Sequence, residues 1–168
     1  MSQFTKTAHQ AEKHLAALNS SLKVFLQAAE NYPRHAVQKK PSAKAFSATE
    51  IVYHMLDVEH LWQERMRGLV EQTMTHFQQM DPDKVAIEKN YNEKPYDKGI
   101  LELKKAREET HKLVRAMMPR ELEYVGIHSK YGEMDTFRIL ETIEEHDHTH
   151  AAQLNRTLQQ VSGQSPIG

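Results

Sequence analysis

Apolar side chains recur every three or four residues along four stretches of this chain, and this spacing places them on one face of an α-helix. The predicted helices run from about Thr5 to Asn31, from Ser47 to about Gln72, from about Asp97 to Met118, and from Asp135 or Thr136 to about Val161. Helices with one apolar face bury those faces against one another. The pattern therefore predicts an all-α fold, a four-helix bundle with long connectors.

Residues at the predicted helix ends support these boundaries. Ser47 and Glu50 have the spacing of a capping box, in which the hydroxyl and the carboxylate each take a free backbone N–H. Pro33 and Pro119 follow the first and third helices, and proline restricts the residue before it to extended conformations. The connector from Thr73 to Tyr96 is expected to be irregular and to cover one end of the bundle. The stretch from Arg120 to Asp135 is expected to be a second connector.

Length and composition narrow the class of protein. With 168 residues, the chain fits a single domain over residues 1–168, with an ordered core of about 5–161 and a disordered tail. With a net charge of −1, the chain has no excess of positive charge to attract nucleic acid or anionic lipid. We therefore expect neither a nucleic-acid partner nor a membrane partner. The absence of an apolar leader or of a membrane-spanning apolar run favours a cytoplasmic protein. The chain has no cysteine, which excludes disulfides, iron–sulfur clusters and a protein thiol nucleophile.

Candidate chemistry is concentrated in the stretch EEHDHTHAAQ near the C-terminus. His146 and His150 are four residues apart, so on a helix they lie one above the other and can reach a single metal ion. On a helical wheel they lean about 85° and 45° from the core stripe, on the same side. His148 and Glu145 point away from the core. The stretch therefore contains one inward-leaning pair of candidate ligands.

A third ligand is expected from His54, which occupies the corresponding shoulder of the second predicted helix. If the second and fourth helices are neighbours, His54, His146 and His150 converge at the edge of the core. Three neutral imidazoles suit Zn²⁺ or Ni²⁺, and three protein ligands leave a position open for water or substrate.

Three further residues are candidates for supporting roles. Glu50 lies one turn before His54 and is a candidate hydrogen-bond acceptor for it or a catalytic base. Gln153 lies one turn after the histidine pair and is a catalytic candidate that would orient a bound water or substrate group. Asp147 points toward the core, where it must be hydrogen-bonded, either near the metal or in a purely structural role.

Two other interpretations compete with the three-histidine site. A pair of histidines four residues apart on a helix is often an ordinary surface feature. A di-iron carboxylate bundle needs Glu-x-x-His on two helices, and the chain contains Asp57-x-x-His60 and Glu145-x-x-His148. Both of these pairs point away from the core, which disfavours that alternative.

The segments ATEIVYHMLDVEHLW and HDHTHAAQL together resemble the DinB-like superfamily of four-helix metalloproteins. In that family a histidine early in the second helix joins an H-x-x-x-H pair followed by x-x-Q in the fourth, which here are His54, His146, His150 and Gln153. The stretch SKYGEMDTFRILETIEEHD is also similar. One departure is Ala151-Ala152, where many members have Arg-Gly. The resemblance implies a divalent metal, often zinc or nickel, and frequently a homodimer.

Three functions remain open at this point. Some members of the family resemble metal-dependent transferases that use a low-molecular-weight thiol cosubstrate, others are mycothiol-dependent isomerases, and many have no known activity. The first hypothesis is such a thiol transferase, the second is a metal-stabilised bundle that acts through a protein partner without catalysis, and the third is a metal-dependent hydrolase. Hydrolysis needs a general base near the metal, and Glu50 and Asp147 are the candidates.

Overall fold

The computed structural model describes residues 3–163, and four long helices in this range form the predicted bundle. They are α1 (Gln3–Glu30), α2 (Ala48–Val70), α4 (Tyr96–Ala116) and α5 (Thr136–Ser162). Their ends agree with the sequence prediction to within a few residues. The last five positions, 164–168, where most of the expected tail falls, lie outside the described residues.

Side-chain caps explain where two of these helices begin. The Ser47 hydroxyl accepts a hydrogen bond from the Glu50 backbone N–H at 3.1 Å, and the Glu50 carboxylate accepts one from the Ser47 N–H at 2.8 Å, so the capping box is confirmed. The Asp135 carboxylate accepts from the Arg138 N–H at 2.8 Å in the same way and caps α5. These bonds satisfy N–H groups that have no partner inside the helix.

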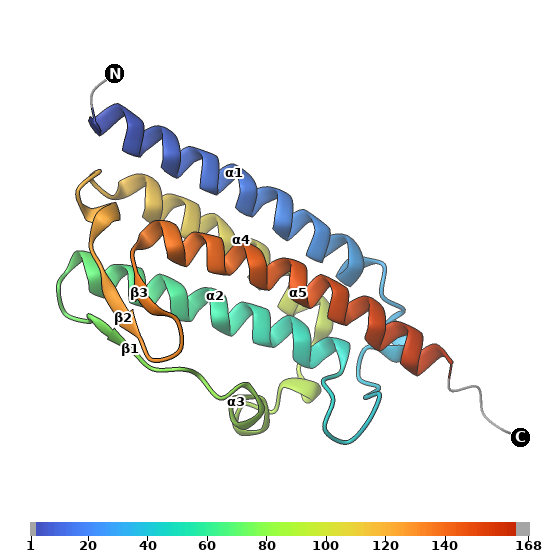
Figure 1. Cartoon of the computed structure of the whole chain (residues 1–168). Coiled ribbons are helices and arrows are strands. Elements are labelled where there is room, and N and C mark those ends of the chain that lie inside the picture. The colour runs from blue at the N-terminus through green and yellow to red at the C-terminus, as the bar shows by residue number, and fades with distance from the viewer. Residues whose placement is uncertain (1–2, 164–168) are drawn as a thin grey trace, which may run out of the picture.

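The helices pair as α1 with α5 and α2 with α4, and α2 also contacts α5 (Figure 1). The contact between α2 and α5 confirms the neighbourhood on which the three-histidine prediction depended. Apolar side chains fill the bundle in two adjoining groups. One includes Leu15, Trp62, Met66 and Ile143, and the other includes Phe25, Ile51, Leu103 and Leu154.

The connector after α2 is more ordered than the sequence analysis predicted. It contains the short strand β1 (His76–Phe77), helix α3 (Pro82–Glu88) and the 3-10 helix η2 (Tyr91–Glu93). A local signal for α3 was present, since Asp81 caps it through the Lys84 N–H and proline occupies its first position. The Tyr91 hydroxyl donates to Asp57 of α2 and ties this segment to the bundle.

The connector before α5 contains the 3-10 helix η3 (Glu121–Glu123) and two strands, β2 (Gly126–His128) and β3 (Gly132–Met134). Strand β1 pairs in parallel with β2, and β2 pairs antiparallel with β3, so a small sheet covers one end of the bundle (Figure 1). Gly132 has a φ of +75° and makes the tight turn possible. A further 3-10 helix, η1 (Arg34–Ala36), follows α1. The sheet places His128 beside Trp62 of α2.

Candidate metal centre

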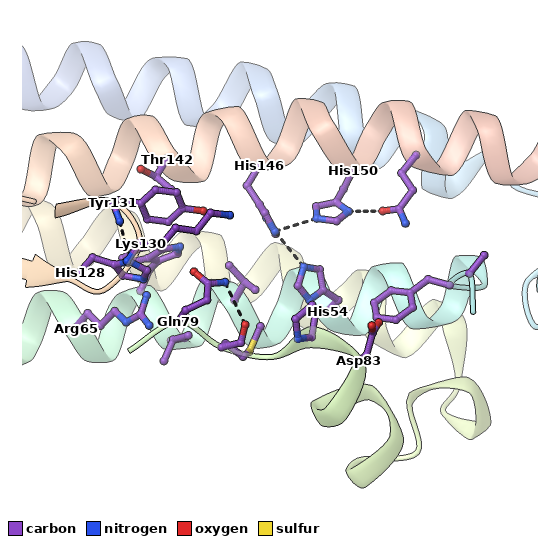
Figure 2. A pocket seen from close by; sticks show the side chains of 18 of the residues that line it. His54, Arg65, Gln79, Asp83, His128, Lys130, Tyr131, Thr142, His146 and His150 are labelled. Carbon is purple, nitrogen blue, oxygen red and sulfur yellow. Dashed lines mark hydrogen bonds between the residues drawn. The ribbon is translucent and has the colours of Figure 1, made fainter. Parts of the chain in front are cut away.

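Three imidazoles from two helices meet at one point on the side of the bundle (Figure 2). The Nε2 atom of His146 lies 3.0 Å from Nε2 of His54 and 2.9 Å from Nε2 of His150. His54 comes from α2, while His146 and His150 occupy consecutive turns of α5. The structure thus brings together the three residues that the sequence analysis selected.

Burial keeps these imidazoles neutral. Removal from water is the main reason that the pKa of His54 is lowered to about 3, with a further contribution from His150. The same desolvation lowers the pKa of His146 well below its ordinary value and also lowers that of His150. Neutral imidazoles present lone pairs, which is the form that binds a metal.

The donor set fits a divalent cation better than it fits a network of hydrogen bonds. The Nε2 atom of His146 faces two other nitrogens, and one N–H can satisfy only one of these contacts. Nitrogen ligands about 2.1 Å from a common ion are separated by roughly 3.0–3.4 Å. The two distances to His146 are close to this value, and all three ligand nitrogens lie within 4.8 Å of one another. A cation at this point would engage the lone pairs of all three histidines.

Gln153 orients one of the three histidines. The Nδ1–H of His150 donates to the Gln153 side-chain carbonyl at 2.5 Å, which leaves the Nε2 lone pair on the side of His146. Such a partner fixes the tautomer and the ring orientation of a metal-binding histidine. Gln153 also lines the adjoining cavity, so its amide N–H groups remain near the position where a substrate would lie.

The prediction that Glu50 accepts a hydrogen bond from His54 is wrong. The Glu50 carboxylate bonds to the Ser47 N–H and to the Lys40 ammonium at 3.0 Å, and Nδ1 of His54 is buried without a hydrogen-bond partner. Glu50 does not line the cavity beside the histidines. Its carboxylate is held by the helix cap, because the N-terminal turn of α2 supplies a nearer donor.

The remaining acidic and histidine candidates serve other purposes. Asp147 is fully buried and bonds to Arg107 and to the Ser21 hydroxyl, so its role is structural. His60 and His148 are exposed, as predicted, and do not belong to the cluster. Since these two histidines would be ligands in the di-iron alternative, the structure gives that alternative no support.

A cavity of about 390 Å³ opens directly beside the three imidazoles (Figure 2). Its walls come from α2, α5, the segment before α2, the stretch around α3 and the β2–β3 hairpin. The lining residues that were not predicted from the sequence include Arg65, Asp83, His128, Lys130 and Tyr131. Arg65 could have been predicted from the sequence, because it follows His54 by eleven residues, which is three helical turns along the same face.

Fold and site together define a helical-bundle protein with a cluster of three histidines whose geometry is consistent with a metal site. A family profile for the DinB superfamily matches residues 17–154, and the chain belongs to that superfamily. Among solved structures, the chain is similar to YfiT from Bacillus subtilis, described as a probable metal-dependent hydrolase with an unusual four-helix bundle topology. The two are 16% identical with a TM-score of 0.76, and the match covers 98% of this chain and 91% of YfiT.

A comparison with curated proteins found no match. Within residues 3–163, no helix combines the length and the apolar character needed to cross a bilayer.

Proposed function

We propose that this protein is a metal-dependent transferase that holds a divalent cation, zinc or nickel, at His54, His146 and His150 and uses a low-molecular-weight thiol as cosubstrate. The observation that carries this proposal is the position of the three imidazoles at the wall of a cavity large enough for a small molecule. A site of three neutral nitrogens beside open space is typical of catalytic rather than structural metal sites.

The residues of the chain contribute binding and orientation. The three histidines would hold the cation, and Gln153 keeps His150 in the tautomer whose Nε2 lone pair would bind it. A bound divalent cation would supply one element of the chemistry, the lowering of the thiol pKa so that the thiolate is present at neutral pH. The thiol proton would leave to solvent. A lone pair of the thiolate sulfur would then form a bond to an electrophilic carbon of the second substrate, and the leaving group would depart with the electron pair of the bond that breaks.

Two features favour a thiol over water as the nucleophile. A thiol that ionises on binding needs no general base, and the cavity has one carboxylate among its described lining residues, Asp83. Asp83 is exposed, and its side chain makes no hydrogen bond or ion pair with the described residues, so these residues do not fix it against the imidazoles. The chain itself contains no cysteine, so the thiol must come from outside.

Metal-dependent hydrolysis is the second candidate. It is favoured by the description of YfiT as a probable metal-dependent hydrolase and by the position of Asp83 on the cavity wall. In that case Asp83 would be the general base, and Asp83→Asn would abolish ester or amide turnover. In a thiol transferase the same substitution leaves the binding of thiols unchanged.

The proposal is tested with Co²⁺-loaded protein, because sulfur ligation to cobalt produces a characteristic absorption band. Titration with 6-mercaptohexanol should produce the band with saturation, and His146→Ala should lose it while His148→Ala keeps it. A complete lack of thiol binding by the cobalt-, nickel- and zinc-loaded protein would overturn the proposal.

A further inference from the structure

The cavity has a second polar end, away from the three imidazoles. Arg65, His128, Lys130 and Tyr131 lie there, three helical turns along α2 from His54 (Figure 2). Trp62 also lines this part of the wall, with its ring centroid 5.8 Å from that of His128. A molecule that enters the cavity can therefore contact both ends at once.

Arg65 is a buried cation without a carboxylate partner. Its residue is only 4% exposed, and none of the described acidic side chains lies within ion-pair distance of it. Nη2 donates to the Gln78 carbonyl at 2.5 Å, and the guanidinium lies 4.4 Å over the Trp62 ring. Burial lowers the pKa of Arg65 to about 10, which still leaves it charged at neutral pH. A guanidinium has five N–H donors, so most of these remain available for a ligand.

A second buried arginine in the same bundle, Arg107, has the carboxylate partners that Arg65 lacks. Arg107, 2% exposed, makes paired hydrogen bonds to Glu59 at 2.9 Å and to Asp147 at 2.9 and 3.0 Å. A buried charge is costly unless an opposite charge accompanies it. The fold supplies that charge for Arg107. Arg65 has no such carboxylate beside it and faces the cavity instead.

His128 adds a neutral donor to this end. Its Nδ1 accepts hydrogen bonds from the backbone N–H groups of Lys130 at 3.0 Å and Tyr131 at 3.3 Å, so the ring proton is on Nε2. Burial, assisted by the charges of Arg65 and Lys130, lowers the pKa of His128 and keeps it neutral. Nothing in residues 3–163 accepts from Nε2, which leaves that N–H for an oxygen atom in the cavity.

The charge of the whole cavity agrees with an anionic occupant. Three cationic side chains line it, Lys44, Arg65 and Lys130, against the single carboxylate of Asp83. Guanidinium groups bind carboxylate and phosphate oxygens through paired hydrogen bonds. The aromatic rings of Trp62 and Tyr131 provide an apolar wall for the carbon skeleton.

We propose that Arg65 and the Nε2–H of His128 bind the acidic group of the substrate, a carboxylate or a phosphate, so that the protein acts on small anionic molecules. The orientation of the reactive end toward the imidazoles rests on the proposed function. The binding of the acidic group does not, because it requires no metal.

Trp62 makes a direct test possible, because it is the only tryptophan of the chain and lies at this end of the cavity. The full chain, zinc-loaded and metal-free, is titrated with hexanoate, hexyl phosphate and hexanol while tryptophan fluorescence is recorded. At least one of the two acids should bind about tenfold more tightly than hexanol, and the tighter of the two identifies the acidic group. Equal affinity of hexanol and both acids, or no saturable change with either acid, would overturn the proposal.

Substitutions of Arg65 test whether this residue causes the preference for an acid over hexanol. Arg65→Gln keeps an N–H donor for the Gln78 carbonyl but removes the charge, and it should abolish the preference for the acid over hexanol. Arg65→Lys should retain part of it, and Arg115→Gln, an exposed arginine of α4, should retain all of it. An unchanged preference in folded Arg65→Gln contradicts the proposal. If that variant does not fold, the wild-type comparison of the acids with hexanol still decides.

A second titration separates this inference from the proposed function. Co²⁺-loaded protein is titrated with 6-mercaptohexanoate and 6-mercaptohexanol, which have equal chain length. If both bind equally well, and neither hexanoate nor hexyl phosphate binds more tightly than hexanol, the thiol function stands and the anion site fails. If neither binds and hexanoate still changes the fluorescence of the metal-free protein, the anion site stands and the thiol function fails.

Discussion

Two buried polar clusters lie against α5, and they differ in whether the protein satisfies them. Asp147 belongs to the first, in which Arg107, Glu59, Thr110 and Ser21 use one another's donors and acceptors. His146, the residue directly before Asp147, belongs to the second, in which three imidazoles direct the same kind of nitrogen at one another. Burial alone therefore does not distinguish a structural cluster from a binding site.

The two clusters differ in whether their buried groups find partners within the protein. Burial alone would lower the pKa of Arg107, but the carboxylates of Glu59 and Asp147 outweigh it and raise the pKa above its ordinary value. The same burial lowers the pKa of each imidazole in the second cluster, because no carboxylate forms an ion pair with these rings, and the charge of Asp57 offsets only part of the effect on His54. The first cluster is complete without a ligand, whereas the second would be completed by a cation.

The largest expected effect follows from breaking the satisfied cluster. Arg107→Met leaves Glu59 and Asp147 buried without their cation, and the free energy of unfolding should fall by about 3–5 kcal/mol. Urea unfolding of the metal-free protein measures this. A loss below about 1 kcal/mol would show that the two carboxylates find other partners or protons.

Metal loading should affect only the second cluster. Free zinc at about 1,000 times its dissociation constant should raise the free energy of unfolding by about 4 kcal/mol. His146→Ala should abolish this gain, and His148→Ala, two residues along the same helix but exposed, should preserve it. Equal gains in the two variants would mean that zinc binds elsewhere.

The pH dependence of the metal-free protein should also come from the histidine cluster. The pKa of His54 is about 3 in the folded protein and 6.5 in the reference state, so the unfolded chain binds more protons between these values. Stability should therefore be fully present above pH 6.5 and fall as the pH decreases below it, by up to about 1.4 kcal/mol per pH unit for each such histidine.

Urea unfolding at several pH values between 7.5 and 5 measures this slope. His54→Asn should reduce it, whereas substitution of His60, an exposed histidine of the same helix, serves as the control. If the slope is the same in His54→Asn and in the wild type, the acid sensitivity arises outside the cluster.

Two neighbouring serines give a smaller test of the satisfied cluster. The buried Ser21 hydroxyl donates to Asp147 at 2.6 Å, and Ser21→Ala should lower the free energy of unfolding by about 1.5–3 kcal/mol. Ser20 is exposed and bonds to a carbonyl of its own helix, so Ser20→Ala should change stability by less than about 0.5 kcal/mol. Thermal or urea unfolding of the pair measures the difference, and equal effects would remove Asp147 from the explanation.

The smallest effect is expected for the residue that orients a ligand. Gln153→Ala removes the acceptor of His150 Nδ1–H and should weaken zinc affinity about tenfold, measured by competition with a chelator. Gln160→Ala, an exposed position of the same helix, is the matched control. Unchanged affinity in Gln153→Ala would mean that His150 keeps its orientation by packing alone.

Features that depend on local spacing could be predicted from the sequence. The capping box at Ser47 and the apolar periodicity predicted the helices, and the four-residue interval between His146 and His150 identified the pair of candidate ligands. The small sheet could not be predicted, because its strands of two or three residues form only when Phe77 and His128 meet across the fold. The predicted hydrogen bond from His54 to Glu50 is absent because the Glu50 carboxylate instead accepts a hydrogen bond from the Ser47 N–H in the helix cap.

Which residues share a helix face follows from the order of the amino acids alone, because an α-helix has 3.6 residues per turn. The packing of the helices in three dimensions sets α2 beside α5, which brings His54 to a pair of histidines about ninety positions away. It also decided that Arg107 meets two carboxylates while Arg65 meets a cavity. The charge and burial of the two arginines are alike, so the difference arises from which residues the packing of the helices places opposite each one.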